Sequence, residues 1–315
     1  MSLYTKINNF LFNKRIRFDY LQKLGFYNHL NDQDFLKKKF KIVLEYELDL
    51  KHLRTFNEKL QWLKLNDRKD IYSTMVDKIE AKKYVSRIIG KNHIIPTLQV
   101  CDCVENLRLD ELPDKFVIKC NHNSGLGMYI CKDKKEFQQE KKKIYKNLKK
   151  GLEQDYYLHN REWPYKNVKR KILVEKFMEN ASGEALVDYK VMCFEGEPKI
   201  IKVVKKWEQT PTQDFYDLSW KKLDLSESDM PVSDIYIKKP VFLDEMIDLS
   251  RKLAKGLHHI RVDWYYINGT LYFGELTFYD GAGFDRFNPR KYEKIMGDWI
   301  TLPIDEQRPA MKSQA

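Results

Sequence analysis

The segment from 260 to 284, IRVDWYYINGTLYFGELTFYDGAGF, constrains the fold more than any other part of the chain. Arg261 and Asp263 are two positions apart in a strand-like run, and Glu275 and Thr277 have the same spacing in the next run. The Asn-Gly pair between the two runs is typical of a hairpin turn. Buried charges cost free energy unless they are paired or bind a metal. The segment therefore predicts a β-hairpin that carries a metal and phosphate site on one face.

The register of this hairpin decides whether the two carboxylates meet, because side chains alternate between the faces of a strand. A strict two-residue turn at Asn268-Gly269 would place Asp263 opposite Gly274 and turn Glu275 to the other face. We therefore expect an odd-membered loop or a bulge near Gly269, which would pair Asp263 with Glu275. Two facing carboxylates repel each other unless a cation lies between them, and Mg²⁺ is the natural candidate. A solvent-exposed acidic pair is the alternative.

A polar segment that contains glycine, residues 121–127, joins two further strand-like runs at 116–120 and 128–131. The backbone N–H groups of such a hairpin tip can bind phosphates, although many tips have this composition. Lys119 lies in an apolar strand just before the tip, where it must reach either an anion or the surface. An α-phosphate is a suitable partner for this lysine.

Two more segments carry candidate ligand contacts. Residues 73–89 predict a helix capped by Thr74 and stopped by Gly90, with Lys78 in its first turns. The strand-like run at 171–177 ends with a carboxylate and an aromatic ring that could contact an adenine. An ordinary strand end is the alternative.

The remaining pattern predicts separate helices and mainly antiparallel strands, which is typical of an α+β fold. Residues 1–66 have a helical pattern, and we interpret Asp32-Gln33-Asp34 as the start of a helix rather than as a metal motif. A hairpin is expected at 186–204 with its turn at 195–197, and a helix is expected at 242–257.

The net charge of +11 favours anionic partners, although a lysine excess that serves solubility is an equal alternative. No apolar run is long enough to span a bilayer, and no signal-peptide core is present, so we expect a cytoplasmic protein. The basic, amphipathic first 45 residues could rest on a membrane surface, although a solvated helix face explains them equally well. Five cysteines without zinc spacing predict free thiols.

The ordered set of these motifs resembles the ATP-grasp superfamily, and within it the TupA-like group named after teichuronopeptide biosynthesis. The likeness covers about residues 56–300. It is carried by Phe56-Asn57-Glu58-Lys59-Leu60-Gln61-Trp62, Phe116-Val117-Ile118-Lys119-Cys120-Asn121-His122, Asp188-Tyr189-Lys190 and Gly274-Glu275-Leu276-Thr277-Phe278.

The resemblance implies an ATP-grasp fold of class α+β, in which two α+β subdomains clamp ATP next to a helical N-terminal region. The implied boundaries are 1–66 for the helical region, 67–111 for a helix and linker, 112–180 and 181–303 for the two lobes, and 304–315 for a tail.

The resemblance also implies roles for individual residues, with ATP and Mg²⁺ as cofactors. Arg261 and Lys119 would act on the transferring phosphoryl group, and Asp263, Glu275 and Thr277 would hold magnesium. Thr277 stands where many ATP-grasp enzymes have Asn as the last metal ligand, and its hydroxyl can still ligate magnesium or position a water. The implied nucleotide contacts are Lys78, Lys119, His122, Asn123, Ser124, Gly125, Gly127, Glu175, Lys176, Phe177, Asp188 and Lys190.

The implied reaction is the ligation of a carboxylate to an amine through an acylphosphate. The resemblance suggests that an amino acid or amine is joined to a hexuronic acid, or to an amino sugar, of a bacterial capsule or cell-surface polysaccharide. Lys205, Lys206, Trp207 and Arg286 could line the sugar site, and no nucleic acid is expected as partner. A glycosyltransferase and a non-catalytic binder of acidic glycans are the alternatives.

Overall fold

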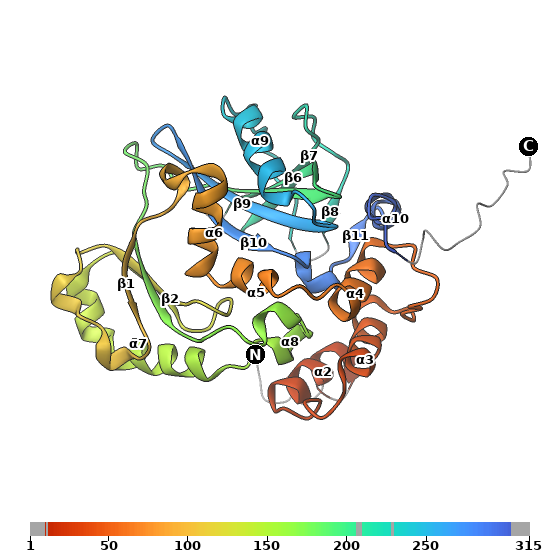
Figure 1. The fold of residues 1–315 in the computed structure, drawn as a ribbon, viewed down its shortest axis with the longest axis horizontal. Coiled ribbons are helices and arrows are strands. Elements are labelled where there is room, and N and C mark those ends of the chain that lie inside the picture. The colour runs from red at the N-terminus through yellow and green to blue at the C-terminus, as the bar shows by residue number, and fades with distance from the viewer. Residues whose placement is uncertain (1–9, 11, 206–209, 228–229, 304–315) are drawn as a thin grey trace, which may run out of the picture.

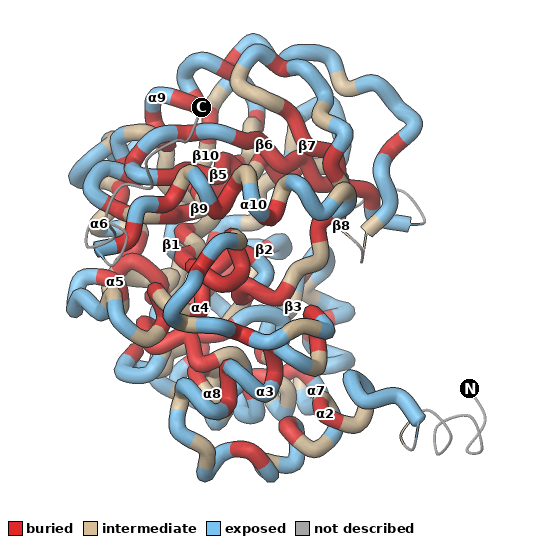
Figure 2. The backbone as a smooth tube through the Cα atoms, turned by 90° about the vertical axis from the view of Figure 1, so that its right-hand side faces the viewer, coloured by how far each residue is buried: buried red, intermediate tan, exposed pale blue. Residues whose placement is uncertain are grey.

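Two antiparallel sheets and a group of N-terminal helices form the computed structural model, which describes residues 10, 12–205, 210–227 and 230–303. The smaller sheet lies at the left of Figure 1 and the larger one at the top, with helices α2 and α3 at the lower right. In Figure 2 the strands of the larger sheet and helix α4 are mostly buried. Within these residues no helix has the length and apolar character needed to cross a membrane.

The smaller sheet has four strands in the order β1-β4-β2-β3. Their bounds are Thr97–Cys101 for β1, Phe116–Cys120 for β2, Met128–Cys131 for β3 and Ile172–Lys176 for β4. Helix α7 (Lys134–Glu153) contributes Phe137, Ile144 and Leu148 to the core of this lobe, together with Phe116 and Ile118. The expected strands at 116–120 and 128–131 are confirmed, whereas β1 was not predicted.

The larger sheet has five strands in the order β10-β9-β5-β6-β7. Their bounds are Asp188–Phe194 (β5), Glu197–Lys205 (β6), Thr212–Tyr216 (β7), His259–Ile267 (β9) and Thr270–Thr277 (β10). Helix α9 (Leu243–Ala254) packs on β5, β6 and β9, and the indole N–H of Trp264 donates to Ser250 Oγ at 2.9 Å. The expected hairpin at 186–204 and the helix near 242–257 are confirmed.

The N-terminal region consists of α2 (Lys14–Lys23), α3 (Asp32–Leu44) and α4 (Phe56–Asn66). Asn31 caps α3 by accepting a hydrogen bond from the Asp34 N–H at 2.9 Å, so the expected helix start at Asp32 is confirmed. Aromatic side chains of α2 and α3 share a buried cluster with Phe284 from the C-terminal part of the chain.

The helix expected at 73–89 is wrong as a single element. It consists of α5 (Ile71–Val76) and α6 (Glu80–Ile89), with Lys78 in the break between them. Asp77 has an extended backbone, and its carboxylate accepts from the Ile79 N–H and from the Asn121 side chain, both at 2.9 Å. These two bonds compete with the helical backbone and end α5.

The other elements are short. They are α8 (Tyr157–Asn160), α10 (Lys291–Asp298), β8 (Ser226–Glu227), β11 (Phe287–Asn288) and the 3₁₀ turns η1 (Lys91–His93), η2 (Val104–Asn106), η3 (Leu109–Glu111), η4 (Trp163–Tyr165) and η5 (Asp280–Gly283). All five cysteines are free, as expected.

Candidate active site

The β9–β10 hairpin contains a β-bulge that brings its two carboxylates to one face. Ile267 pairs with Thr270 across a two-residue turn, and the regular register ends where Trp264 pairs with Phe273. Arg261 then pairs with Thr277, so Gly274 and Glu275 together stand opposite Asp263.

The expected need for a bulge is therefore confirmed, but its expected place near Gly269 is wrong. Asn268 and Gly269 both have positive φ, +50° and +86°, as a two-residue hairpin turn requires. The turn closes regularly, so the extra residue has to be accommodated further along the strand. Gly274 suits the bulge because a Cβ there would lie 3.2 Å from the Asp263 carbonyl oxygen.

Arg261 binds the acidic residues of this face. Its Nε and Nη2 donate to the two oxygens of Asp263 at 2.7 and 2.9 Å, and Nη2 also donates to Glu275 Oε1 at 3.0 Å. Lys190 is a second cation on Asp263. Burial alone would raise the pKa of Asp263, but Arg261 and Lys190 outweigh it and hold that pKa below its usual value. The Thr277 hydroxyl lies 3.4 Å from Glu275 Oε1.

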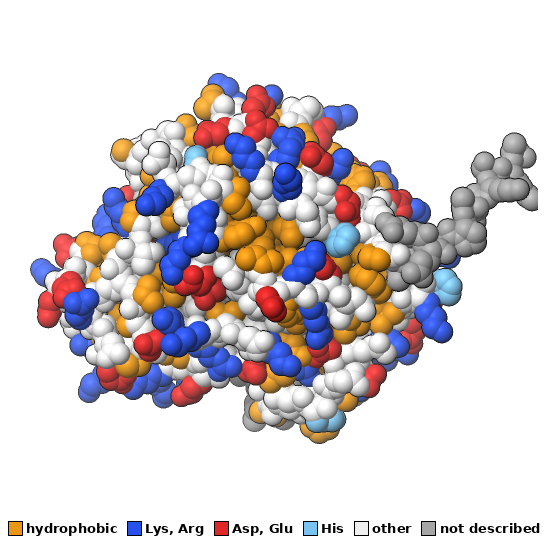
Figure 3. All heavy atoms as spheres, in the orientation of Figure 1, with side chains coloured by type: hydrophobic (Ala, Val, Ile, Leu, Met, Phe, Trp, Pro, Cys, Tyr) orange, Lys and Arg blue, Asp and Glu red, His pale blue; other side chains and the backbone are white. Residues whose placement is uncertain are grey.

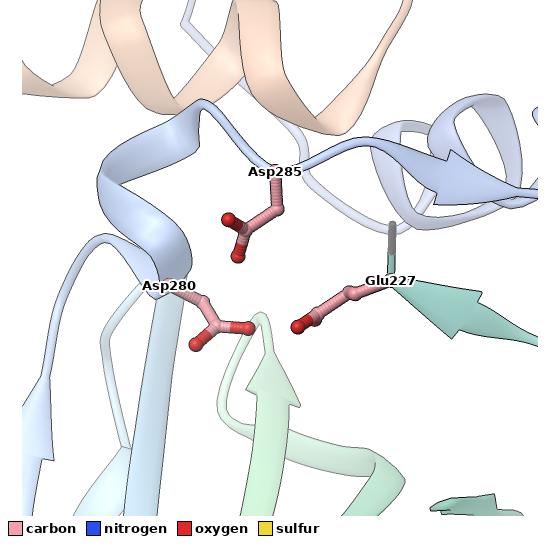
Figure 4. Close-up of side chains that lie close together, drawn as sticks. All are labelled: Glu227, Asp280 and Asp285. Carbon is pink, nitrogen blue, oxygen red and sulfur yellow. The ribbon is translucent and has the colours of Figure 1, made fainter. Parts of the chain in front are cut away.

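Behind Arg261 lies a second acidic group that sequence reasoning missed, formed by Glu227, Asp280 and Asp285 (Figure 4). Ligand oxygens of these three residues lie within 4.8 Å of one another. Lys202 Nζ donates to Asp280 at 2.8 Å and lies 2.6 Å from Glu227, while the other Asp280 oxygen accepts from Arg261. Because Lys202 and Arg261 already pair with two of the three carboxylates, we interpret the group as an ion-pair network that orients Arg261 rather than as a metal site.

The segment that carries Asp280 is held by helix α4. Gly281, Ala282 and Gly283 all have positive φ, which is an uncommon conformation for Ala282. Lys64 Nζ donates to the Ala282 carbonyl and Gln61 Nε2 to the Gly283 carbonyl, both at 2.7 Å.

One turn earlier in α4, Asn57 Nδ2 donates to the Asp285 carbonyl at 2.7 Å. Asn57, Gln61 and Lys64 are fully buried and spaced along one face of the helix. Two of the seven residues of the motif at 56–62, Asn57 and Gln61, thus bind the segment after the β9–β10 hairpin.

Three lysines line the opposite side of the site. The Lys78 backbone N–H donates to the Asn121 carbonyl at 3.1 Å, and its Nζ donates to the Asn123 carbonyl at 2.7 Å. Lys119 and Lys82 both pair with Glu175, whose buried carboxylate lies between them. Burial lowers the pKa of Lys78, and an anion bound beside Nζ would raise that pKa again because it stabilises the charged form.

A cavity of about 190 Å³ separates the lysines from the carboxylates. Nine of the expected site residues line it, which are Lys78, Lys119, Asn123, Ser124, Gly125, Asp188, Lys190, Asp263 and Glu275. Tyr265 is a further lining residue, and its hydroxyl interacts with Asp188. A smaller adjoining cavity contains Glu175, Lys82 and Tyr165. The sequence did not single out Lys82 or Tyr265, although Tyr265 continues the two-residue spacing of Arg261 and Asp263.

Other expected contacts lie outside this cavity. His122 Nε2 lies 3.1 Å from the Gln154 carbonyl at the end of α7, and Lys176 donates its backbone N–H to Pro96 at 3.0 Å. The ring of Phe177 contacts Lys115, with Nζ 5.9 Å from the ring centre.

Of the residues expected to line a sugar site, Lys205 and Arg286 do not line this cavity. Arg286 donates to the Val43 carbonyl, Lys205 Nζ donates to Ser233 Oγ at 3.3 Å, and Lys206 and Trp207 lie outside the described residues.

Gly127 packs the hairpin tip against α7. Its φ is +72°, and a Cβ would lie 2.7 Å from Cys120 Sγ and 3.0 Å from the Gly151 Cα. Gly127→Ala is therefore expected to lower the free energy of unfolding by about 2 kcal/mol or more, measured by urea denaturation. Gly125→Ala is the control, because Gly125 has a φ of +84° with no atom within 4 Å of the added Cβ. Equal costs for the two variants would contradict the packing argument.

Comparison with known proteins identifies the family. The model of the family described as TupA-like ATPgrasp matches residues 58–301. The chain belongs to the TupA-like ATP-grasp family. This membership confirms the resemblance and the α+β ATP-grasp fold, and it makes ATP with Mg²⁺ the cofactors whose fit to the site has to be tested.

Solved structures give weaker likenesses to this TupA-like chain. The D-alanine–D-alanine ligase from Bacillus anthracis, complexed with ATP, is 18% identical over 65% of this chain and 53% of its own, with a TM-score of 0.38. The L-amino acid ligase from Bacillus licheniformis is 12% identical over 72% of this chain and 49% of its own, with a TM-score of 0.43. The chain thus spans about half the length of these two structures. No curated protein matches it.

Proposed function

We propose that this chain is an ATP-dependent carboxylate–amine ligase that forms an amide through an acylphosphate. One observation carries the proposal: two lysines and a glycine-containing tip face the carboxylates of Asp263 and Glu275 across a single cavity. Such an arrangement suits a metal-bound triphosphate, because the lysines neutralise phosphate charge and the carboxylates bind the metal.

The donor set fits Mg²⁺, which prefers oxygen ligands and usually keeps part of its water shell. Asp263 and Glu275 would hold the ion, and the Thr277 hydroxyl lies close enough to Glu275 to contribute. Bound magnesium would neutralise charge on the phosphates during transfer. Arg261 would stabilise the phosphoryl group in transit, held in place by Asp280.

The nucleotide contacts follow the cavity walls. Lys78 and Lys119 would bind phosphates beneath the tip formed by Asn123, Ser124 and Gly125. Asp188 would bind the ribose, with Lys190 beside it. The adenine would lie near Glu175 and the backbone of Lys176 and Phe177. In this role Glu175 also positions Lys119 and Lys82, because its carboxylate pairs with both.

The proposed lobes are residues 112–180 and 181–303, which contain most of the smaller sheet and all of the larger one. Helix α4 belongs to the proposed N-terminal region, yet it directly contacts the η5 segment of the second lobe, through the carbonyls of Ala282 and Gly283. The N-terminal region is therefore proposed to complete the active site rather than to form a separate unit.

The proposed substrates are an amino acid or amine and a hexuronic acid, or an amino sugar, of a cell-surface polysaccharide. The net charge of +11 supports an acidic sugar. A glycosyltransferase would need a metal-binding Asp-x-Asp motif at the end of a strand, and Asp32-Gln33-Asp34 is the candidate for it. This alternative is disfavoured because Asp32 begins helix α3, where its carboxylate binds Arg68 at 2.8 Å and accepts from Tyr157. The proposed location is the cytoplasm.

Ligand-dependent thermal unfolding tests the nucleotide part of the proposal. ATP with Mg²⁺ is expected to raise the melting temperature, since a ligand at 100 times its Kd adds about 2.7 kcal/mol to stability. UDP-sugars with the same metal are expected to leave the melting temperature unchanged. Stabilisation by UDP-sugars and none by ATP would contradict the ligase and support the glycosyltransferase. A rise in melting temperature with acidic glycans, and none with ATP or UDP-sugars, would support the non-catalytic binder of acidic glycans.

A screen of ADP release then addresses the substrates. Amino acids and simple amines would be paired with glucuronate, galacturonate and amino sugars, and ADP release is expected for pairs that contain both a carboxylate and an amine. Equal ADP release without any acceptor pair would show hydrolysis rather than ligation.

A further inference from the structure

Helix α2 has an exposed apolar face that the proposed ligase site does not use. Phe12, Ile16, Tyr20 and Leu24 are all exposed, and they follow one another at intervals of four residues. Residues four apart differ in direction by about 40° on a helix, so Ile16, Tyr20 and Leu24 cover one face of about 80°, while Phe12 precedes the helix and its Asn13 cap. Phe26 continues the face in the turn after α2 and is 61% exposed. We refer to these five residues as the α2 face.

The opposite side of α2 makes its contacts with the rest of the protein. Phe18 and Gln22 are buried, and Phe18 stacks on Tyr27 with ring centres 4.6 Å apart. The residues of the α2 face lie outside this buried cluster, although the Phe26 ring packs edge-on against Tyr27. Hydrophobic side chains also reach the surface at the lower edge of Figure 3, over α2 and the following turn. Large apolar side chains that gather on one exposed face indicate an interaction surface.

Basic residues flank the α2 face. Lys14 and Lys23 are exposed near the two ends of the helix. Beside the N-terminal end lies an open groove of about 890 Å³, which also reaches α3 and the segment after η5. Its charged lining residues are Lys14, Arg15, Lys41 and Arg286, with Glu45 as the carboxylate among them. The groove is thus predominantly basic and suits phosphate groups.

We propose that the α2 face docks on the surface of an anionic phospholipid bilayer. Helices that lie in the membrane interface combine an apolar face with flanking lysine and arginine, and each basic residue near the surface adds to the attraction. The apolar side chains enter the interface, while the groove accepts lipid phosphates. A second copy of the chain suits this face less well, because a two-fold interface would bring the same basic residues together.

Vesicle sedimentation with the full chain tests this proposal. The protein is expected to pellet with vesicles of equal parts phosphatidylglycerol and phosphatidylcholine, and far less with phosphatidylcholine alone. The triple variant Ile16→Ser, Tyr20→Ser, Leu24→Ser is expected to lose about tenfold or more in vesicle affinity. The matched control replaces Ile235, Tyr236 and Val241 with Ser, because these are equally apolar and exposed residues far from α2 in the sequence.

A series of lysine-to-glutamate variants separates the electrostatic part of the attraction to the membrane from the apolar part. Lys14→Glu with Lys23→Glu is expected to weaken binding to the anionic vesicles, whereas Lys142→Glu with Lys146→Glu on α7 changes the net charge equally and is expected to have a smaller effect. Salt is expected to weaken wild-type binding, because exposed charges are screened. Each variant would first be checked for an unchanged melting temperature.

Three outcomes would overturn the proposal. They are failure of the wild-type chain to pellet with anionic vesicles, equal losses in the serine triple variant and its control, and a concentration-dependent dimer that the serine variant dissolves. The last result would show that the α2 face binds a second copy of the chain. None of these readouts depends on ligase activity, so the proposed function and this surface can fail separately.

Discussion

Glu275→Ala is expected to reduce magnesium-dependent ADP release about 100-fold or more while the protein stays folded. The variant removes one of the two carboxylates proposed to bind the metal, so the metal would lose a ligand where charge develops during transfer. The fold is expected to tolerate the change because the Glu275 side chain is 39% exposed and its hydrogen bonds go to Arg261 and Thr277. Steady-state kinetics with the acceptor pair from the screen would measure the effect.

A second readout keeps this prediction independent of the acceptor. Thermal unfolding with ATP, with and without Mg²⁺, should show a metal-dependent shift in the wild type that is strongly reduced in Glu275→Ala. Glu184→Ala, an exposed carboxylate outside the cavity, is the control for general loss of charge. Full activity and an unchanged metal-dependent shift in Glu275→Ala would remove Glu275 from the metal site.

Arg261→Ala is expected to have the largest combined effect, lowering the free energy of unfolding by about 3–5 kcal/mol and abolishing ligation. The reason is that Asp263 and Asp280 are almost fully buried and would each lose a guanidinium partner. Urea denaturation would measure the stability loss. Arg261→Lys keeps one positive charge but cannot bind both carboxylates of the hairpin and Asp280 together. Its free energy of unfolding should therefore lie between those of the wild type and Arg261→Ala.

The pH dependence separates this explanation from a simple loss of packing. In the wild type the pKa of Asp263 is below its usual value, so its contribution to stability is present above about pH 4 and is lost as the pH falls. Without Arg261 that pKa should rise, because burial then dominates. The stability difference between wild type and variant should therefore shrink as the pH falls from neutral towards 4. A difference that stays constant over this range would contradict the charge argument.

The sequence predicted which side chains share one face of the hairpin, but it did not predict the position of the bulge. The spacing of Arg261, Asp263, Glu275 and Thr277 predicted one shared face, and parity alone required an irregularity. Its position could not be predicted, because an Asn-Gly turn closes regularly and the bulge depends on Gly274 fitting against Asp263. Lys78 lines the cavity but does not lie within a helix as expected, since one of the two Asp77 bonds that break the helix comes from the distant Asn121.

Contacts between distant segments were the main omission. Asp280, Lys202 and the buried side chains of α4 have no pattern that marks them as partners, although the motif at 56–62 contributed to the family resemblance. The backbone of residues 281–283 is left-handed, and the two glycines among these three residues were a partial indication of that conformation in the sequence. What the sequence could not show was that these carbonyls accept hydrogen bonds from α4.

The contact between α4 and the η5 segment also bears on the order in which the protein can fold. Asn57, Gln61 and Lys64 are separated by 218 to 228 residues from the carbonyls that they bind at 282–285. A ribosome therefore makes the three donors long before their acceptors, and contacts of such long range form slowly. Until the acceptors emerge, these polar groups must stay hydrated, because burying them without partners costs free energy. Arg261 can likewise form its ion pair with Asp280 only when almost the whole chain has been synthesised.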